Sequence, residues 1–428
     1  MGGVKVFMYV SVLAILKSTP DLSLNVCCTF TVTSVSGLLL PQFHACYGGL
    51  AVQYPLTNNI VFHSTGASGY IGGTILHALV NRLPDFEYTA LVRNRAAADK
   101  IQRAYPNVAI ALGDLDSLET LQKEAASADI VINAANNDHI ASIPAILSGL
   151  STPFPQDDPL KRESDKNRYL IHTSGTSILL DKAFGRGTST GHLYNDSATT
   201  HRELIFGIPD DAWHRDADKL VLLPDQCPRA RNVHVAIVCP PCIYGRGTGT
   251  GKVVSWQLPQ LVKHFIKRGK GFTVHEGEAV WGNVHVVDLA EIYLLLFHLA
   301  VSGSDDSSLW DTTGGYYLSA SGEHHWGHTM KTVAQILYDQ GKISSAEVDP
   351  LSPEDLHALG SVTGGLEWGC NSRGKAVHAR NDLHWKPTHG ELVTPAPASE
   401  TWTQGIPLGL GMEELLEEVA MVEEGLCD

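Results

Sequence analysis

A glycine-rich segment separates a short apolar run from a helix-like pattern in this chain. The run covers residues 60–64, and apolar side chains recur at helical spacing from 70 to 82. Such a loop can bind phosphate, because its glycines permit a tight turn, close approach of the anion and packing of helix on strand. This context predicts a dinucleotide site; a glycine-rich turn in another α/β fold is the alternative. The segment consists of Gly66, Ala67, Ser68, Gly69, Tyr70, Ile71 and Gly72.

Arginines follow the second apolar run, at the position where dinucleotide-binding domains distinguish NAD from NADP. Residues 88–92 predict a strand, and Arg93 and Arg95 come directly after it. An acidic side chain there would bind a ribose 2′-hydroxyl, whereas arginine accommodates a 2′-phosphate. We therefore expect NADP, with NAD as the alternative cofactor, and Arg93 as the main phosphate contact. In the other interpretation, both arginines are solvated surface charges.

The elements around these residues alternate between strand and helix. Strand-like runs at 108–112, 130–134, 169–172 and 233–238 are interleaved with helical patterns at 96–104 and 118–126. Alternation of this kind requires a parallel sheet with helices on both faces. The sequence thus predicts an α/β protein with a Rossmann-like doubly wound parallel sheet.

Further motifs occur in the same order as in a known family. They are Gly113-Asp114-Leu115-Asp116, Asn133-Ala134-Ala135, His172-Thr173-Ser174-Gly175-Thr176, Pro240-Pro241-Cys242-Ile243-Tyr244-Gly245, the run from Asn283 to Ala290, and Leu383-His384-Trp385-Lys386-Pro387. Together with the glycine loop they resemble the extended and atypical short-chain dehydrogenase/reductase superfamily, close to its epimerase-like and NmrA-like branches. The resemblance covers roughly residues 59–387.

The resemblance implies a role for each motif. Asp114 and Leu115 would lie near the adenine, and Asn133, Ala134 and Ala135 beside the cofactor ribose. Pro240 would belong to the loop that closes over the nicotinamide. Ser174 would occupy the position of the catalytic serine or threonine.

One feature of the family is missing. Its Tyr-x-x-x-Lys pair, in which lysine lowers the tyrosine pKa, does not occur between Ser174 and Pro240. His214 and Asp218 occupy those positions in a predicted helix at 213–219, four residues apart and so on one face. His214 would act as the acid and Asp218 would orient it. The alternative is that reductase chemistry is lost; the literal match Tyr338 to Lys342 is too far downstream and is treated as coincidence.

Other residues that could do chemistry have simpler explanations. The CxxC spacing of Cys239 and Cys242 suggests redox chemistry, but the family motif accounts for this segment without it. A histidine group at 324, 325 and 328 lacks partner ligands, so we expect a solvated loop and no metal site. Trp281 and His285 are expected to border the substrate pocket.

Bulk composition narrows the class of protein. The 428 residues carry a formal net charge of −15, and no basic patch for nucleic acid is found. Eight irregularly spaced cysteines do not predict a secreted disulfide framework, so we expect a cytoplasmic protein. We expect an extension at 1–58, a nucleotide-binding domain at 59–250, a substrate lobe at 251–387 from which residues 284–299 return to the core, and an arm with an acidic helix at 388–428.

The first 58 residues allow three interpretations. The apolar stretch at 6–16 resembles a weak signal core but is too short to span a membrane, and no clear cleavage site follows it. A targeting segment, a poorly ordered extension and a misassigned translation start remain open, and we favour the last two. No membrane partner is expected.

Two functional hypotheses follow. The first is an NADP-dependent oxidoreductase or epimerase-like enzyme acting on a small carbonyl or hydroxyl compound, with Ser174 polarising the oxygen and His214 handling the proton. The second is an NmrA-like sensor that binds the nucleotide without turning it over. The oligomeric state stays open, with a homodimer as one option.

Overall fold

The computed structural model describes residues 31–35, 38–42, 44–47, 50–53, 61–153, 166–181, 193–197, 206–361, 363, 365–389, 416 and 419–422. The chain divides into two compact units, residues 1–54 and 55–428. Described strands of the first unit form two antiparallel hairpins, β1 (Thr31–Val35) with β2 (Leu38–Gln42) and β3 (His44–Tyr47) with β4 (Leu50–Gln53). The sequence shows no clean period in this part of the chain, and among these strands β1 is the one rich in Val and Thr, which favour strands.

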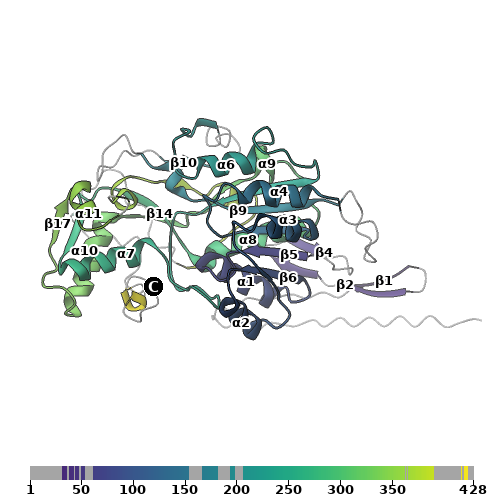
Figure 1. Ribbon diagram of the computed structural model, residues 1–428, viewed down its shortest axis with the longest axis horizontal. Helices are drawn as coiled ribbons and strands as arrows, with labels where there is room; N and C mark the ends of the chain where they lie inside the picture. Colours follow the sequence, from purple (N-terminus) through teal and green to yellow (C-terminus); the bar gives the residue numbers. More distant parts are fainter. Residues whose placement is uncertain are drawn as a thin grey trace, which may run out of the picture. The chain divides into compact units, whose positions relative to one another are not determined.

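A seven-stranded parallel sheet forms the centre of the second unit (Figure 1). The strand order runs outward in both directions from β5 and β8, which makes their carboxyl ends the topological switch point. This confirms the predicted Rossmann-like doubly wound fold. In sheet order the strands are β15 (Tyr316–Leu318), β11 (Val233–Cys239), β9 (Arg168–Thr173), β8 (Ile130–Asn133), β5 (Val61–Thr65), β6 (Glu87–Val92) and β7 (Ala109–Leu112).

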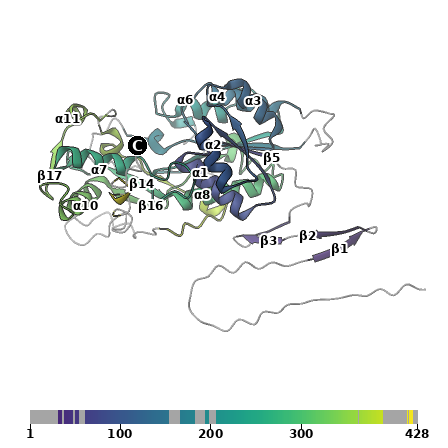
Figure 2. The ribbon, with the colours of Figure 1, turned by 60° about the horizontal axis from the view of Figure 1, so that its bottom comes forward.

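Helices cover both faces of this sheet (Figures 1 and 2). On one face α3 (Leu118–Ser127), α4 (Ser142–Ser151) and α6 (Arg215–Leu222) pack together, and on the other α1 (Tyr70–Arg82) packs against α8 (Val286–Val301). Helix α2 (Arg95–Ala104) connects β6 to β7. Because parallel strands are covered on both faces, β8, β9 and β11 are buried along their whole length.

A smaller lobe follows β11 in the chain (Figure 1). Its core packs around the buried side chains of Trp281, Trp326 and Trp368. The described end of the chain joins this core through Val419, which is fully buried. The lobe elements are β12 (Cys242–Tyr244), α7 (Gln257–Arg268), β13 (Gly271–Val274), β14 (Val280–His285), β16 (Gly322–His325), α10 (Trp326–Asp339), β17 (Val348–Leu351), α11 (Pro353–Ala358) and α12 (Leu366–Gly369).

Short elements tie the two parts of this unit together. β10 (Tyr194–Asn195) pairs in parallel with β18 (Gly374–Lys375), and the other short elements are η1 (Thr176–Leu179), α9 (Asp311–Gly314) and α13 (His378–Asn381). The buried Asp196 carboxylate accepts backbone N–H bonds from Leu318, Val377 and His378, which fastens this region to the sheet edge. The extended arm expected after Pro387 lies almost entirely outside the described residues.

No helix within the described ranges has the length and apolar character needed to cross a bilayer.

Candidate cofactor and active site

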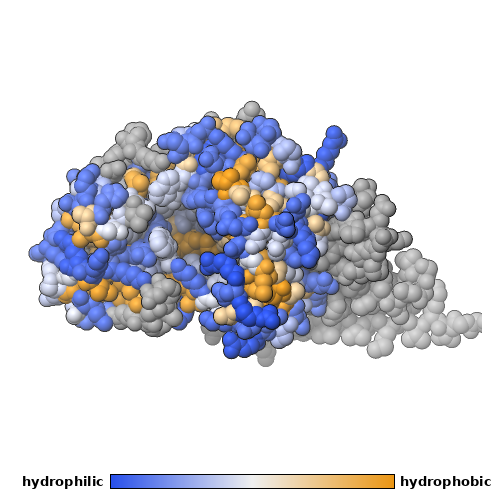
Figure 3. Space-filling model, viewed as in Figure 1, coloured by the Kyte–Doolittle hydropathy of each residue, from blue (hydrophilic) through white to orange (hydrophobic). Residues whose placement is uncertain are grey.

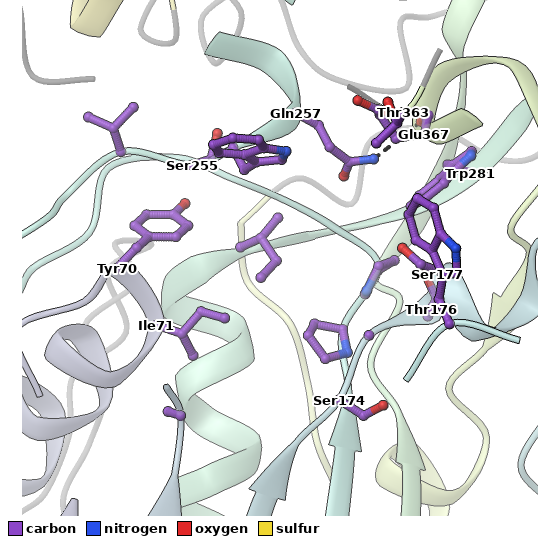
Figure 4. A pocket seen from close by; sticks show the side chains of 18 of the residues that line it. Tyr70, Ile71, Ser174, Thr176, Ser177, Ser255, Gln257, Trp281, Thr363 and Glu367 are labelled. Carbon is purple, nitrogen blue, oxygen red and sulfur yellow. Dashed lines mark hydrogen bonds between the residues drawn. The ribbon is translucent and has the colours of Figure 1, made fainter. Parts of the chain in front are cut away.

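A cavity of about 400 Å³ opens at the carboxyl ends of the sheet strands. Figure 4 shows Tyr70 and Ile71 of α1 on one side of it and Trp281, Thr363 and Glu367 of the lobe on the opposite side. In Figure 3 a hollow with hydrophobic residues at its base lies between the sheet and the lobe. This is the position at which doubly wound proteins bind their ligands. The lining consists of Tyr70, Ile71, Ala134, Ser174, Gly175, Thr176, Ser177, Trp213, Pro240, Pro241, Ile243, Lys252, Val254, Ser255, Trp256, Gln257, Trp281, Thr363 and Glu367.

The glycine loop between β5 and α1 leaves no room for side chains. Gly66 has a φ of 75°, and a Cβ atom there would lie 2.5 Å from the Ala134 carbonyl oxygen. A Cβ at Gly72 would lie 2.4 Å from the Gly66 oxygen. Gly69 caps α1 without any side-chain hydrogen bond to the first turn. The loop therefore fits a dinucleotide, because a phosphate can approach the backbone and the helix N-terminus there.

A chain of hydrogen bonds links the ends of the three central strands. The Thr65 hydroxyl donates to Asn133 Oδ1 at 2.5 Å, and Asn133 Nδ2 donates to His172 Nδ1 at 3.0 Å. Burial lowers the pKa of His172 to about 4, so its ring is neutral and can accept this bond. Asn133 thus holds the β8 loop in position, and Ala134 next to it lines the cavity.

His214 lies beside the cavity at the start of α6. Its Nδ1 is 2.8 Å from the Asp138 carboxylate and 2.9 Å from Asn137 Nδ2. The opposite side of the ring faces Gly175, where a Cβ atom would lie 3.1 Å from Nε2. A proton on Nδ1 would donate to the Asp138 carboxylate and leave a lone pair on Nε2, whereas an unprotonated Nδ1 would accept from Asn137 Nδ2.

The Asp218 carboxylate does not form the hydrogen bond with the His214 ring that the sequence led us to expect, although the Asp218 N–H donates to the His214 carbonyl at 3.0 Å. His214 has a φ of 65°, and its ring contacts the loop after β8, whereas the Asp218 side chain is fully buried. The Asp218 carboxylate accepts a hydrogen bond of 2.9 Å from the Tyr316 hydroxyl. Burial raises the pKa of Asp218 to about 6. The carboxylate that lies beside the His214 ring is that of Asp138 instead.

Ser174 lies at the floor of the cavity, but its hydroxyl is turned inward. The Oγ atom is buried beside Asp218 and Cys239 and has no hydrogen bond of ordinary geometry among the described residues. The hydroxyl of Thr176 is buried and unpaired in the same way. Ser177, which the sequence did not single out, also lines the cavity and is half-buried.

The remaining cofactor residues predicted from the family motifs surround the strand ends. Arg93 is exposed at the end of β6, and Arg95 forms an ion pair of 3.9 Å with Asp99. Asp114 accepts a hydrogen bond from Ser117, which lowers the pKa of the Asp114 carboxyl. Pro240 lines the cavity together with Tyr70, Ile71, Ala134 and Ser174, whereas Arg93, Asp114, Leu115, Asn133, His214 and Asp218 are not part of its lining.

A second glycine-rich loop packs on the first and was missed from the sequence. It runs from Gly245 to Lys252, and the hydroxyl of Tyr70 donates to the Gly245 carbonyl at 2.6 Å. The Lys252 N–H donates to the Ser68 carbonyl at 2.9 Å, and the exposed Lys252 side chain lines the cavity. Glycine at every second position from 245 to 251 was the available signal. Its result is a cation next to the phosphate-binding loop.

The histidines and cysteines that could suggest a metal or redox site lie in regular elements. The histidine group is not a solvated loop, because His324 is buried in β16 and His328 lies in α10, and burial lowers the pKa of both. Within the described residues, no cluster of His, Cys, Asp or Glu could hold a metal ion. Cys239 and Cys242 are both fully buried.

The two aromatic residues expected at the pocket differ in their placement. Trp281 lines the cavity, and its indole N–H donates to the Cys370 carbonyl at 2.7 Å. His285 lies outside the lining and stacks on His389 with ring centroids 4.2 Å apart. Tyr338 is exposed on α10 away from the cavity lining.

Comparisons with known proteins agree with this geometry. A family model described as NAD(P)H-binding matches residues 66–149. Oxidase ucsJ of an Acremonium species is 32% identical over 343 residues, which cover 77% of this chain and 93% of that protein. An uncharacterized protein of Schizosaccharomyces pombe, C2A9.02, is 24% identical and covers 77% and 96% respectively.

Solved structures show the same fold at low sequence identity. The dTDP-glucose 4,6-dehydratase DesIV of Streptomyces venezuelae, with NAD bound, has a TM-score of 0.53 and 15% identity over 85% of this chain and 97% of that one. UDP-glucose 4-epimerase of Thermotoga maritima has a TM-score of 0.52 and 12% identity over 86% and 100%. The chain belongs to the extended and atypical short-chain dehydrogenase/reductase superfamily. It carries an NAD(P)-binding domain of that superfamily.

Proposed function

We propose that this protein is an NADP-dependent oxidoreductase that interconverts a carbonyl and a hydroxyl group in a small molecule. The observation that carries the proposal is the His214–Asp138 pair beside Gly175, at the edge of a cavity next to the glycine loop. The family's tyrosine and lysine are absent, and this pair offers a proton donor at the corresponding position. The name oxidase given to the Acremonium relative supports an oxidoreductase.

His214 handles the proton in this proposal. In the oxidising direction its Nε2 takes the proton of the substrate hydroxyl, and the Asp138 carboxylate stabilises the imidazolium that forms. In the reducing direction Nε2 returns that proton to the substrate oxygen. The nicotinamide cofactor, when bound, accepts or supplies the hydride at the substrate carbon. Proton and hydride together account for the two hydrogen atoms transferred.

The preference for NADP rests on positive charge near the adenosine end of the cofactor site. Arg93 is exposed at the end of β6, where the 2′-phosphate of NADP would lie. Lys252 lies beside the glycine loop, where it would neutralise the pyrophosphate of NADP and NAD alike. An epimerase-like reaction, in which the hydride returns to the same compound, would use the same residues.

A sensor that binds the nucleotide without turnover is the second candidate. The observation in its favour is the buried Ser174 hydroxyl, which faces Asp218 rather than the cavity. In that case His214 would have a structural role only.

The experiment that tests the proposal is a fluorescence titration of the full chain with NADPH and NADH, followed by turnover assays over a panel of carbonyl compounds. We expect tighter binding of NADPH, and loss of that preference in Arg93→Ala. Turnover should disappear in His214→Ala and persist in His357→Ala, an exposed histidine on α11. Binding without turnover would favour the sensor, and binding of neither nucleotide would overturn the proposal.

A further inference from the structure

Charge is distributed unevenly along the cavity. Two charged side chains occur in its described lining, Lys252 and Glu367. The backbone of Lys252 is bonded to Ser68 of the glycine loop, whereas Glu367 belongs to α12 in the lobe. Figure 4 shows Glu367 across the cavity from Tyr70, the residue that follows the glycine loop. The cavity therefore has a cationic end near the cofactor loop and an anionic end in the lobe.

The Glu367 carboxylate is held in place without a cation. The Thr363 hydroxyl donates to its Oε2 atom, and the Gln257 side-chain amide donates to the Glu367 backbone carbonyl at 3.3 Å. No ion pair involves Glu367 in the part of the chain that the structure describes. Burial raises the pKa of its carboxyl, which means that the charged form is poorly solvated there. A carboxylate in this state gains most from a cationic partner, because Thr363 already supplies a neutral donor.

Aromatic surface adjoins this carboxylate. Trp281 forms part of the wall and is almost fully buried. Trp256 is 61% exposed, and the Lys252 ammonium lies 5.8 Å from its ring centroid, so Trp281 is the indole that we assign to the ligand. Trp213, Pro241 and Ile243 add further apolar surface to the lining. Indole faces attract organic cations, and aromatic side chains around a carboxylate are suited to recognise an ammonium group with an apolar body.

We propose that the substrate is an amine: a compound with an apolar body whose protonated nitrogen pairs with Glu367, while its carbonyl or hydroxyl group is held at the Gly175–His214 end. This rests on the proposed function for the reacting group, but the pairing with Glu367 is a property of the cavity itself. Glu367 is a specificity-determining residue in this arrangement. It sets the orientation of the substrate along the cavity.

Calorimetry with two matched probes tests the pairing on the full-length protein, alone and in the presence of NADPH. Tryptamine carries the ammonium group, and tryptophol replaces it with a neutral hydroxyl on the same indole. We expect tryptamine to bind at least about tenfold more tightly than tryptophol, as a charge-assisted pair predicts. Glu367→Gln should remove the preference and leave tryptophol binding unchanged, which also shows that the cavity is intact. Glu347→Gln, which removes an exposed charge elsewhere in the lobe, should retain it.

Equal binding of the two probes, binding of neither, or a preference that survives Glu367→Gln would overturn the amine substrate. These outcomes are separate from those of the nucleotide and turnover assays. A protein that prefers tryptamine but turns over no carbonyl compound would contradict the proposed function alone. A protein that reduces carbonyl compounds with NADPH but shows no amine preference would contradict the substrate class alone.

Discussion

The backbone of His214 decides which acidic residue it contacts. A φ of 65° is unusual for a residue other than glycine and has to be held by surrounding contacts. His214 adopts it as the first, capping residue of α6, and its ring then meets Asp138 from the loop after β8. Asp218, four residues further on, faces the sheet instead. Spacing along the helix was therefore a misleading guide to the partner.

Asp138→Asn tests the orienting role. The amide cannot bind the imidazolium as a carboxylate does, so we expect kcat to fall by about 100-fold, in the range of general acid–base contributions. The Kd for NADPH should stay unchanged, because Asp138 is not part of the glycine loop. Steady-state kinetics and nucleotide titration measure the two quantities. Asp99→Asn, at an exposed position on α2, is the matched control. Unchanged kcat in Asp138→Asn would remove Asp138 from the site.

Asp218 makes a different prediction, about stability against pH. Burial raises its pKa from 3.8 to about 6, so between these values the folded protein keeps a proton that the unfolded chain has lost. Its contribution to the free energy of unfolding is therefore fully present below pH 4 and is lost as the pH rises through 6. In Asp218→Asn this decline should disappear, and the variant should gain up to about 2 kcal/mol over the wild type at pH 7.

Urea denaturation at pH 4.5 and pH 7 checks this expectation. Asp216→Asn, at an exposed position on the same helix, should follow the wild type at both values. If Asp218→Asn loses stability at pH 7, the folded protein stabilises the ionised carboxylate more than the unfolded chain does, contrary to the prediction.

At the scale of elements, one arginine caps the C-terminal ends of two helices. Arg168 begins β9 and is 2% exposed. Its guanidinium donates to carbonyl oxygens at the C-terminal ends of α3 and α4, including those of Ala125 at 2.7 Å, Ala128 at 2.6 Å and Leu150 at 2.7 Å. The Ala125 carbonyl also accepts the N–H of the capping residue Ala128 at 3.2 Å, whereas helix ends generally leave their last carbonyls without partners. The buried guanidinium satisfies such carbonyls and complements both helix dipoles.

Arg168→Met should therefore destabilise the protein strongly. It leaves several buried carbonyl oxygens unpaired, and we expect the free energy of unfolding to fall by about 3–5 kcal/mol. Urea denaturation measures the loss. Arg103→Met, at an exposed position on α2, should cost less than about 0.5 kcal/mol. A similar small loss in Arg168→Met would show that water replaces the guanidinium.

The two glycine loops form one element of cofactor binding. A Cβ atom at Gly251 would lie 2.1 Å from the Ser68 carbonyl oxygen, so Gly251→Ala must push the second loop away from the first. We expect NADPH to bind about tenfold more weakly, because Lys252 moves with the loop. Gly207→Ala is the control, since nothing lies within 4 Å of a Cβ there. Equal NADPH affinity in both variants would separate the second loop from the cofactor site.

At the scale of the whole molecule, local patterns predicted the sheet and not the cavity. The first six strands of the parallel sheet lie within one residue of the runs expected from apolar periodicity, because each run is short, apolar and bounded by polar residues. The seventh, β15, has three residues and no pattern of its own. The tertiary fold brings Glu367 to the cavity and Asp138 to His214. No spacing in the sequence relates either residue to its place in the site.

The lobe and the sheet form opposite sides of the cavity. A substitution among the last described residues tests whether the two sides act independently. Val419 is fully buried in the hydrophobic cluster that also contains Trp281 and Trp368, the neighbour of Glu367. Val419→Ala should lower the free energy of unfolding by about 1–3 kcal/mol and weaken tryptamine binding, since it loosens the wall that positions the carboxylate. NADPH binding should stay unchanged, because the glycine loops lie on the sheet side. Leu416→Ala, at a position 41% exposed in the same segment, should alter neither. A parallel loss of NADPH affinity in Val419→Ala would show that the two sides of the cavity do not act independently.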